Sequence, residues 1–313
     1  MRVGTRGSAL ALAQATLVLQ ALGDGELVPI ITRGDRESAG LDDAAGELAG
    51  DGAPGEPPPG EDKSRWVSEL ERALLAGEID VAVHSAKDVP GELAEGLALI
   101  AAPARAPAED VLCGVSGLDA LPSGARVGTS SARRIAQLRA AREDIEPVAM
   151  HGNVDTRLRK LAGGELDAIV LAHAGLQRLG RGDAVGATLD PLRFVPAPGQ
   201  GALALQARAD DPPTHEALAR IGDASTLCCL LAERALAREL EASCDTPLGA
   251  WAVIEGAHGL RLHAWIGLPD GSAWIADELR GDAAEPRQLG REVAERLRAA
   301  GAGELLREAA LLA

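Results

Sequence analysis

The stretch Val81–Pro90, with the sequence VAVHSAKDVP, indicates both how this chain folds and where its chemistry lies. The apolar, β-branched run 79–83 predicts a short buried strand. Polar side chains come after it and before the proline, namely His84, Ser85, Lys87 and Asp88. Open α/β sheets carry their sites beyond the carboxyl ends of their strands, so this position predicts a functional site. A solvated turn between a strand and a helix would have the same pattern.

The composition limits the kinds of protein this chain can be. With 313 residues, of which 46% are hydrophobic, it has the length of a globular protein of two or three domains. Its formal net charge of −16 argues against a nucleic-acid partner, because phosphate binding needs a basic face. The N-terminal segment 1–22 is too interrupted by Arg and Gly for a signal peptide, and no apolar run approaches the length of a membrane span. We therefore expect a soluble, cytoplasmic protein without a membrane partner.

The four cysteines lack the paired spacing of a zinc site, so we expect no metal. We expect Cys113, Cys228 and Cys229 to be inert core residues, the usual role of an isolated cysteine. Cys244 differs because it lies in the polar, proline-containing segment 241–249, where a thiol would be accessible.

Predicted strands and helices alternate through residues 1–101. Besides the strand that leads to His84, they are expected at 2–5 (strand), 9–22 (helix), 27–32 (strand), 64–76 (helix) and 97–101 (strand). The segment 37–62 interrupts this order, because it is rich in Gly, Ala, Asp, Glu and Pro and has no hydrophobic periodicity. Such a segment is either a mobile lid or simply disordered.

The same alternation starts again in the middle of the chain. Strands are expected at 126–128, 147–150 and 167–172, each with a helix after it, and 202–207 is expected to return to the first group. This order predicts an α/β fold with two doubly wound, parallel lobes and a cleft between them. The first lobe would comprise 1–101 and 199–219, and the second 102–198.

The last part of the chain, 222–313, has a different pattern. A helix over 226–242 precedes three segments that alternate apolar and polar residues, at 249–254, 260–267 and 273–279. The sequence LPDG at Leu268–Gly271 is a strong turn signal between the last two. Two further helices, at 288–299 and 304–312, complete a small α+β domain with a three-stranded antiparallel sheet.

Arginines at expected helix N-termini form the second candidate feature. Arg133 and Arg134 come directly after the turn Thr129-Ser130-Ser131. A strand, a hydroxyl-rich turn and a helix can cradle an anion, and guanidinium groups add bidentate contacts to carboxylates. Solvated helix faces are the alternative, and we accept it for Arg139, Arg142 and Arg159. Ser8 is open in the same way, because it can be an N-cap or a ligand contact.

Seven segments, in order over nearly the whole chain, resemble the porphobilinogen deaminase (hydroxymethylbilane synthase) family. They are RVGTRGSALALAQA, KSRWVSELERALLAGEIDVAVHSAKDVP, VGTSSARRIAQL, HGNVDTRL, LDAIVLAHAGLQRLG, PGQGALALQAR and ASCDTPLGAWA. The resemblance implies two lobes like those of periplasmic solute-binding proteins and a third domain. It implies a transferase that joins four porphobilinogens head to tail, with loss of ammonia, into hydroxymethylbilane. It also implies a dipyrromethane cofactor held by a thioether to Cys244.

The resemblance also assigns roles to residues of this chain. The family's catalytic aspartate falls on Asp88. Positions that bind cofactor or substrate carboxylates fall on Arg6, Lys87, Arg133, Arg134 and Arg157, and other positions lining the cleft fall on Ser8, Thr129, Ser130, Ser131, Arg178 and Gln200. His151, Gly152 and Asn153 match a further binding segment.

Three departures from the family pattern concern binding rather than reaction. His151 stands where the family usually has arginine, which weakens one carboxylate clamp. Trp66 replaces a phenylalanine of the family. The segment 37–62 is longer and more acidic than the family's flap and lacks its Gly-Gly-Lys character, of which only Lys63 remains. Two rival functions stay open: a two-lobed protein that only binds a small anion, since fold alone does not fix function, and a paralogue that has lost activity.

Overall fold

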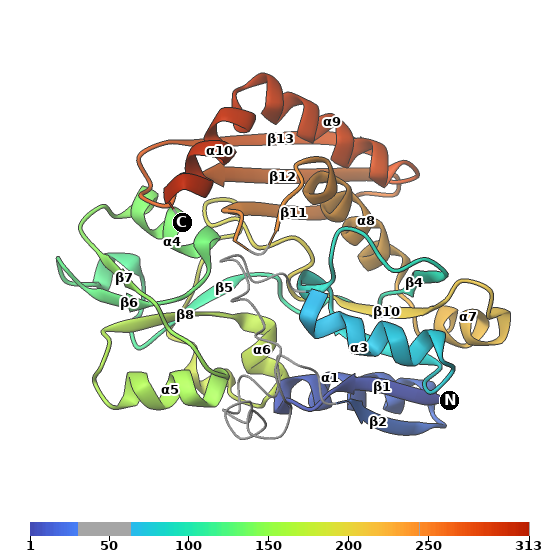
Figure 1. Ribbon diagram of the computed structural model, residues 1–313. Coiled ribbons are helices and arrows are strands. Elements are labelled where there is room, and N and C mark those ends of the chain that lie inside the picture. The colour runs from blue at the N-terminus through green and yellow to red at the C-terminus, as the bar shows by residue number, and fades with distance from the viewer. Residues whose placement is uncertain (31–63, 244, 313) are drawn as a thin grey trace, which may run out of the picture.

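The computed structural model describes residues 1–30, 64–243 and 245–312, and they form two five-stranded sheets and one three-stranded sheet (Figure 1). Lobe 1 has the strand order β2-β1-β3-β10-β4. Its strands are β1 (Arg2–Arg6), β2 (Glu26–Ile30), β3 (Val81–Ser85), β4 (Leu97–Ala101) and β10 (Leu203–Arg208), and its helices are α1 (Ala9–Leu22), α3 (Ser64–Leu75) and α7 (Pro212–Ala219). Strand β10 runs antiparallel to both of its neighbours, and the other pairs are parallel.

Lobe 2 has the strand order β7-β6-β8-β5-β9. Its strands are β5 (Asp110–Cys113), β6 (Arg126–Gly128), β7 (Glu146–Val148), β8 (Ala168–Ala172) and β9 (Ala187–Thr188), and its helices are α4 (Ala132–Ala141), α5 (Val154–Ala162) and α6 (His173–Arg178). Here β5 is the antiparallel strand. The expected all-parallel sheets are therefore wrong in one respect. In each lobe, the strand that comes after a crossing between the lobes enters its sheet in the opposite direction.

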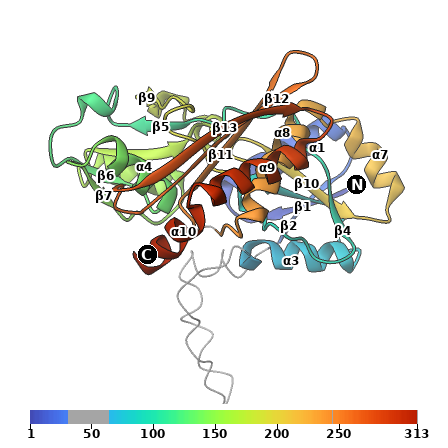
Figure 2. The same cartoon turned by 90° about the horizontal axis from the view of Figure 1, so that it is seen from above.

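The third sheet consists of β11 (Leu248–Glu255), β12 (Gly259–Gly267) and β13 (Trp274–Asp282), all antiparallel. Apolar side chains of α8 (Ala224–Glu239), α9 (Pro286–Ala299) and α10 (Ala302–Leu312) form one core with this sheet. Seen from above, its strands run across the junction of the two lobes (Figure 2). On the other face, Trp251 and Trp265 pack with Ala136 of α4 and Val195.

One buried ion pair joins the three parts of the fold. The Glu233 carboxylate of α8 is fully buried and lies 2.6 Å from Nη1 of Arg105, in the first crossing between the lobes. The same carboxylate accepts hydrogen bonds from the backbone N–H groups of Gly199, in the second crossing, and of Ala252 in β11 (2.6 and 2.8 Å). Because breaking such a pair leaves an uncompensated buried charge, this contact fixes both crossings to the third sheet.

The predicted fold class is confirmed: two doubly wound lobes and a small α+β domain with an antiparallel three-stranded sheet. The helix at 9–22 and the strands at 97–101 and 126–128 have the predicted bounds. The short strand β5 is the main omission, because a buried aspartate opens it and only four residues form it. The predictions for 37–62, Lys63, the side chain of Trp66 and Cys244 fall outside the described residues. No helix in the described part of the chain is both long and apolar enough to cross a membrane.

Candidate active site

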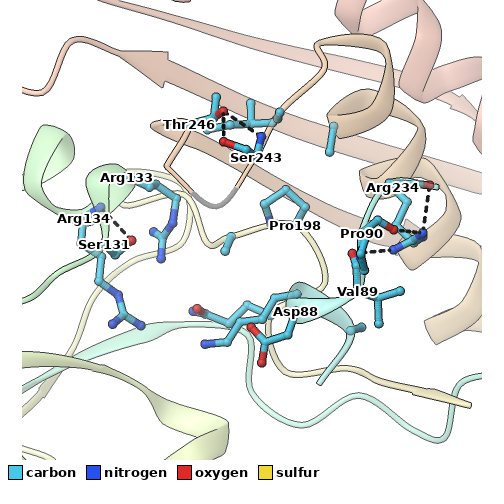
Figure 3. Close-up of a pocket in the computed structure, with 18 of the residues that line it drawn as sticks. Asp88, Val89, Pro90, Ser131, Arg133, Arg134, Pro198, Arg234, Ser243 and Thr246 are labelled. Carbon is cyan, nitrogen blue, oxygen red and sulfur yellow. Dashed lines mark hydrogen bonds between the residues drawn. The ribbon is translucent and has the colours of Figure 1, made fainter. Parts of the chain in front are cut away.

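A cavity of about 520 Å³ lies where lobe 1, lobe 2 and the third domain meet. Lobe 1 contributes the segment 86–91, and lobe 2 contributes Ser130, Ser131 and three arginines, Arg133, Arg134 and Arg157. The wall is completed by Ala197, Pro198 and Gln200 of the second crossing, by α8, and by Ser243 and Thr246. Figure 3 shows Asp88 across the cavity from Arg133 and Arg134. Arg234 lies on the side away from these two arginines, and Ser243 and Thr246 lie at a further edge. Side chains far apart in sequence thus surround one space.

Asp88 lies in a 3₁₀ turn, Ala86–Asp88, directly after β3, and its side chain is half-buried. The second crossing packs against this turn so closely that a Cβ on Gly199 would lie 2.9 Å from the carbonyl carbon of Ala86. From α8, the Arg234 guanidinium donates to the carbonyls of Val89 and Pro90 (3.1 and 2.6 Å). The turn is therefore held from two sides, which fixes Lys87 and Asp88 at the cavity wall.

A buried polar chain lies behind Asp88. His84 is part of β3 and not of the polar turn as expected, and its Nε2 lies 2.9 Å from the amide oxygen of Gln206. The Gln206 amide nitrogen donates to Glu71 Oε1 (2.8 Å), so the imidazole donates through Nε2. Burial lowers the pKa of His84 to about 4, although the nearby Asp88 carboxylate opposes this shift. His84 is therefore neutral at physiological pH.

Two of the expected arginines share one buried carboxylate. Asp110, at the start of β5, is fully buried, and its oxygens lie 2.8 Å from Nη1 of Arg133 and 2.6 Å from Nη2 of Arg134. Arg133 also donates to the carbonyl of Val195, and Arg134 to that of Val170. Burial acts against the charge of Asp110, but the two guanidinium groups hold its pKa well below the usual range. One negative charge thus holds two positive ones at the cavity wall, which leaves a net positive charge there.

Arg157 and Arg178 add positive charge that no carboxylate of the described residues balances within 4 Å. Arg157 donates from Nε to the carbonyl of Gly152 (2.9 Å), and Arg178 from Nη2 to that of Gly201 (2.6 Å). Burial lowers the pKa of Arg157 and, for Arg178, lowers it to about 10. Both arginines line a smaller pocket together with Lys87 and Arg134. These half-buried cations are suited to bind anionic groups.

The hydroxyl and amide residues expected in the cleft also shape it. Ser8 and Ser131 cap α1 and α4, and Ser8 lines a small pocket with Arg6 and Asp88. Ser130 Oγ accepts from the backbone N–H of Met150 and donates to its carbonyl (2.8 and 2.7 Å). Thr129 is buried behind them, where its hydroxyl accepts from Ser131 N. Gln200 donates to Asp110 and to Ala108, while its Oε1 is buried without a hydrogen bond from any described residue.

The segment 151–153 lies apart from these residues. All three residues are exposed, and the described wall of the cavity includes none of them. Asn153 caps α5 through a hydrogen bond from Thr156 N (2.9 Å). Gly152 has φ of +106°, a conformation that favours glycine. The structure therefore brings Asp88, Lys87 and the arginines together but leaves His151 outside the cavity.

Residues on both sides of position 244 indicate how a covalent cofactor would reach this cavity. Ser243 and Thr246 line it, and the Thr246 hydroxyl accepts from the backbone N–H of Ser243 (2.8 Å). In the wall of the same cavity, Arg133 Nε is buried without a hydrogen bond among the described residues. A cofactor that bears carboxylates and is attached in this segment fits such a wall. Among the described residues, no cluster of three or more His, Cys, Asp or Glu could hold a metal ion.

Sequence reasoning missed four residues that organise the site, namely Arg105, Asp110, Glu233 and Arg234. Glu233 carried a signal, because it lies on the same helical face as the buried residues Leu230 and Leu236. An acidic residue on such a face predicts a buried partner. Arg234 and Asp110 gave no comparable signal, because their partners are backbone carbonyls and residues distant in sequence.

Comparison with known proteins agrees with this geometry. Residues 1–216 match the family model described as porphobilinogen deaminase, dipyromethane cofactor binding domain, and residues 226–299 match the one described as porphobilinogen deaminase, C-terminal domain. The porphobilinogen deaminase of Deinococcus radiodurans is 44% identical over 313 residues, which cover 97% of each chain. That of Xanthomonas oryzae pv. oryzae is 45% identical, with 98% of each chain covered.

Proposed function

Since this chain belongs to the porphobilinogen deaminase family, we propose that its cavity joins four porphobilinogen molecules head to tail, with release of ammonia, to give hydroxymethylbilane. The observation that carries this proposal is the placement of Asp88 across one cavity from the buried arginines of lobe 2 (Figure 3). A solute-binding protein would need the cations alone. The pairing of a half-buried carboxylate with them supports chemistry on the bound molecule.

The arginines and Lys87 are proposed to bind carboxylates of the substrate and of the growing chain. Each porphobilinogen carries an acetate and a propionate, so negative charge accumulates as the chain grows. Arg133 and Arg134 are oriented in advance by Asp110, and Arg157 and Arg178 by backbone carbonyls. Side chains held in place before binding lose little entropy when the ligand arrives. Arg6, Ser8, Thr129, Ser130, Ser131, His151, Gly152, Asn153 and Gln200 complete the proposed binding set.

Asp88 is proposed to be the catalytic residue. Loss of ammonia leaves an electron-poor, positively charged carbon on the pyrrole, and an ionised carboxylate beside it lowers the energy of that charge. The same carboxylate can move protons between the pyrrole nitrogen and the departing or released groups. The chain bound to Cys244 as dipyrromethane supplies the pyrrole end on which growth takes place. The 3₁₀ turn Ala86–Asp88 holds Asp88 at the wall, next to Lys87.

Three further assignments belong to the proposal. The domain bounds are 1–101 with 199–219, 102–198, and 222–313; the membership of β10 in the first sheet and of β5 in the second supports them. The protein acts as a monomer, because the cavity is formed by elements of one chain. It works in the cytoplasm on a small-molecule substrate and without a nucleic-acid partner, which its net charge of −16 supports.

Intact mass tests the proposal most directly. The purified protein should be heavier than its sequence by two linked pyrrole units, and it should release four ammonia molecules for each tetrapyrrole formed. Cys244→Ala should fold but lack the added mass, because only a thiolate forms the thioether. Cys228→Ala is the matched control and should keep the added mass of the two pyrrole units. Cys228 is half-buried on α8, and its thiol donates a hydrogen bond to the carbonyl of Ala283.

Two outcomes would contradict the proposal. An adduct that persists in Cys244→Ala would move the attachment to another cysteine. Reversible porphobilinogen binding without added mass or ammonia release would support the rival function of a binding protein.

A further inference from the structure

A second space lined by arginines lies behind the catalytic cavity. This groove, of about 700 Å³, runs between β4 with the segment 91–93 on one side and helices α8 and α9 on the other. The helices contribute Arg234, Arg238, Arg287 and Arg291, while the acidic residues at its wall are Glu92 and Glu239. The groove wall is thus net positive in a chain whose net charge is −16. Arg234 lines both the groove and the catalytic cavity.

The charges of this groove repel one another. Burial lowers the pKa of Arg234 to about 10, and the positive charges of Arg238 and Arg287 act in the same direction. The Arg234 guanidinium is held by backbone carbonyls, those of Val89, Pro90 and Gly91. Its closeness to two other guanidinium groups is therefore unfavourable in the free protein.

The start of α9 adds to the excess of positive charge at the groove wall. Arg287 lies in the first turn of the helix, where the free N–H groups give the end a positive partial charge. The first turn contains no acidic residue, and the N-cap Glu285 makes no side-chain capping bond. Within the described part of the chain, Arg287 and Arg291 make no ion pair within 4 Å. The pair between Arg238 and Glu92, at 3.1 Å, is largely exposed and so contributes little.

We propose that the groove between β4 and helices α8 and α9 is a second anion-binding site, for a molecule that carries several carboxylates. Guanidinium groups from two helices face one space of sufficient size, and they can bind separate carboxylates at the same time. A single small anion would leave most of them unpaired. The polycarboxylate that this protein itself makes is the linear tetrapyrrole, so the identity of the natural ligand rests on the proposed function.

The position of Arg234 gives the site a role. Arg234 holds the carbonyls that come after Asp88 and also lines the groove. A chain that leaves the catalytic cavity beside Arg234 reaches the arginines of α9 next. The groove therefore binds the outer carboxylates of the lengthening or departing product.

Calorimetry with 1,2,3-propanetricarboxylate on the cofactor-loaded protein tests the site without turnover. The double variant Arg287→Gln/Arg291→Gln should bind this probe at least about tenfold more weakly, because two charge-assisted contacts are lost. The matched control is Arg220→Gln/Arg307→Gln, which removes the same charge from exposed arginines elsewhere. It should stay within about twofold of the wild type. Inorganic phosphate should bind the wild type at least about tenfold more weakly than the probe.

Three results would overturn the site: unchanged probe affinity in the double variant, an equal loss in the control, or phosphate binding as tight as that of the probe. The proposed function fails separately. If the wild type binds the probe as expected but carries no pyrrole adduct and releases no ammonia, the groove stands and only its natural ligand changes.

Discussion

The two lobes have the same sheet topology but contribute different charged side chains to the cavity. The orders β2-β1-β3-β10-β4 and β7-β6-β8-β5-β9 correspond strand for strand, including the one antiparallel strand in fourth place. By register, Gly4 in β1 corresponds to Gly128 in β6, and both lack a side chain where a neighbouring apolar residue packs. The next residues, Thr5 and Thr129, are both fully buried. The scaffold is therefore shared down to single positions.

The difference between the lobes lies in the segments beyond their equivalent strands. After β3, lobe 1 places Lys87 and Asp88 in a 3₁₀ turn, whereas after β8 lobe 2 has α6 and its half-buried Arg178. Lobe 2 adds Asp110 at the start of its antiparallel strand, which holds two arginines. The comparison shows that the sheet determines where a site lies and that the turns determine its chemistry. Substitutions in both lobes can test this division, and their expected effects range from a loss of several kcal/mol to a small change in KM.

Asp110→Asn removes the charge that allows lobe 2 to bury two arginines. We expect a loss of about 3–5 kcal/mol in the free energy of unfolding, because two buried guanidinium groups lose their counter-charge. Urea denaturation at pH 7 measures it. Asp144→Asn is the control, because its ion pair with Arg142 is partly exposed, so its removal should lower the free energy of unfolding far less than the removal of the Asp110 charge. Equal losses in the two variants would show that the buried cluster is no more important than a surface pair.

The difference in stability between the wild type and Asp110→Asn should depend on pH. The pKa of Asp110 is lowered in the folded protein, so the unfolded chain takes up its proton first as the pH falls. The stability that Asp110 contributes is therefore complete above about pH 4, the ordinary range of aspartate, and is lost as the pH falls toward the depressed value. The wild type should lose stability below pH 4 more steeply than Asp110→Asn.

Asp88→Asn tests the negative side of the cavity. Turnover should fall about a hundredfold or more, the usual scale for loss of a positioned charge-stabilising or proton-transferring group. The fold and the pyrrole adduct should remain, as circular dichroism and intact mass can show. Asp24→Asn, an exposed change in the same lobe, should leave turnover unchanged. A loss of less than about tenfold in single-turnover assays would make Asp88 a positioning residue.

His84→Gln tests a buried difference between the lobes, since the equivalent position in lobe 2 is Leu171. Burial lowers the pKa of His84 to about 4, so its contribution to stability is present above the usual histidine value of about 6.5 and is lost as the pH falls to 4. The wild type should lose about 1–3 kcal/mol relative to the variant over this window. His258→Gln, at an exposed position, should give the same curve as the wild type. Parallel curves for wild type and His84→Gln would show that His84 is not buried as neutral imidazole.

The local pattern of the sequence predicted the elements well because most of them are short, regular and covered on one face. The helix at 9–22 has Ser8 before it, and the N-cap role expected for this residue is confirmed, because its side chain accepts from Ala11 N. Asp110 could not be predicted, because its partners Arg133 and Arg134 are more than twenty residues away and belong to another strand–helix unit. The position of His84 was missed because its polar type suggested a turn, whereas inside the sheet the amide oxygen of Gln206 accepts its hydrogen bond, and the Gln206 amide nitrogen in turn donates to Glu71. Long-range polar pairing is the part of the site that periodicity does not encode.

His151→Arg has the smallest expected effect and sharpens the comparison on the positive side. The structure places His151 at the exposed N-terminal approach to α5, two residues before its N-cap Asn153, and Arg157 of the same helix reaches the cavity. If residue 151 approaches a carboxylate of the bound chain, a guanidinium can offer it two parallel N–H donors together with a permanent charge, which an imidazole does not combine. We therefore expect His151→Arg to lower the KM a few-fold, since an exposed charge pair contributes less than about 1 kcal/mol. Arg159→Gln, which changes an exposed residue on the same helix, should leave the KM unaffected. An unchanged KM in His151→Arg would assign residue 151 to the helix approach alone and leave carboxylate binding in lobe 2 to the arginines that line the cavity.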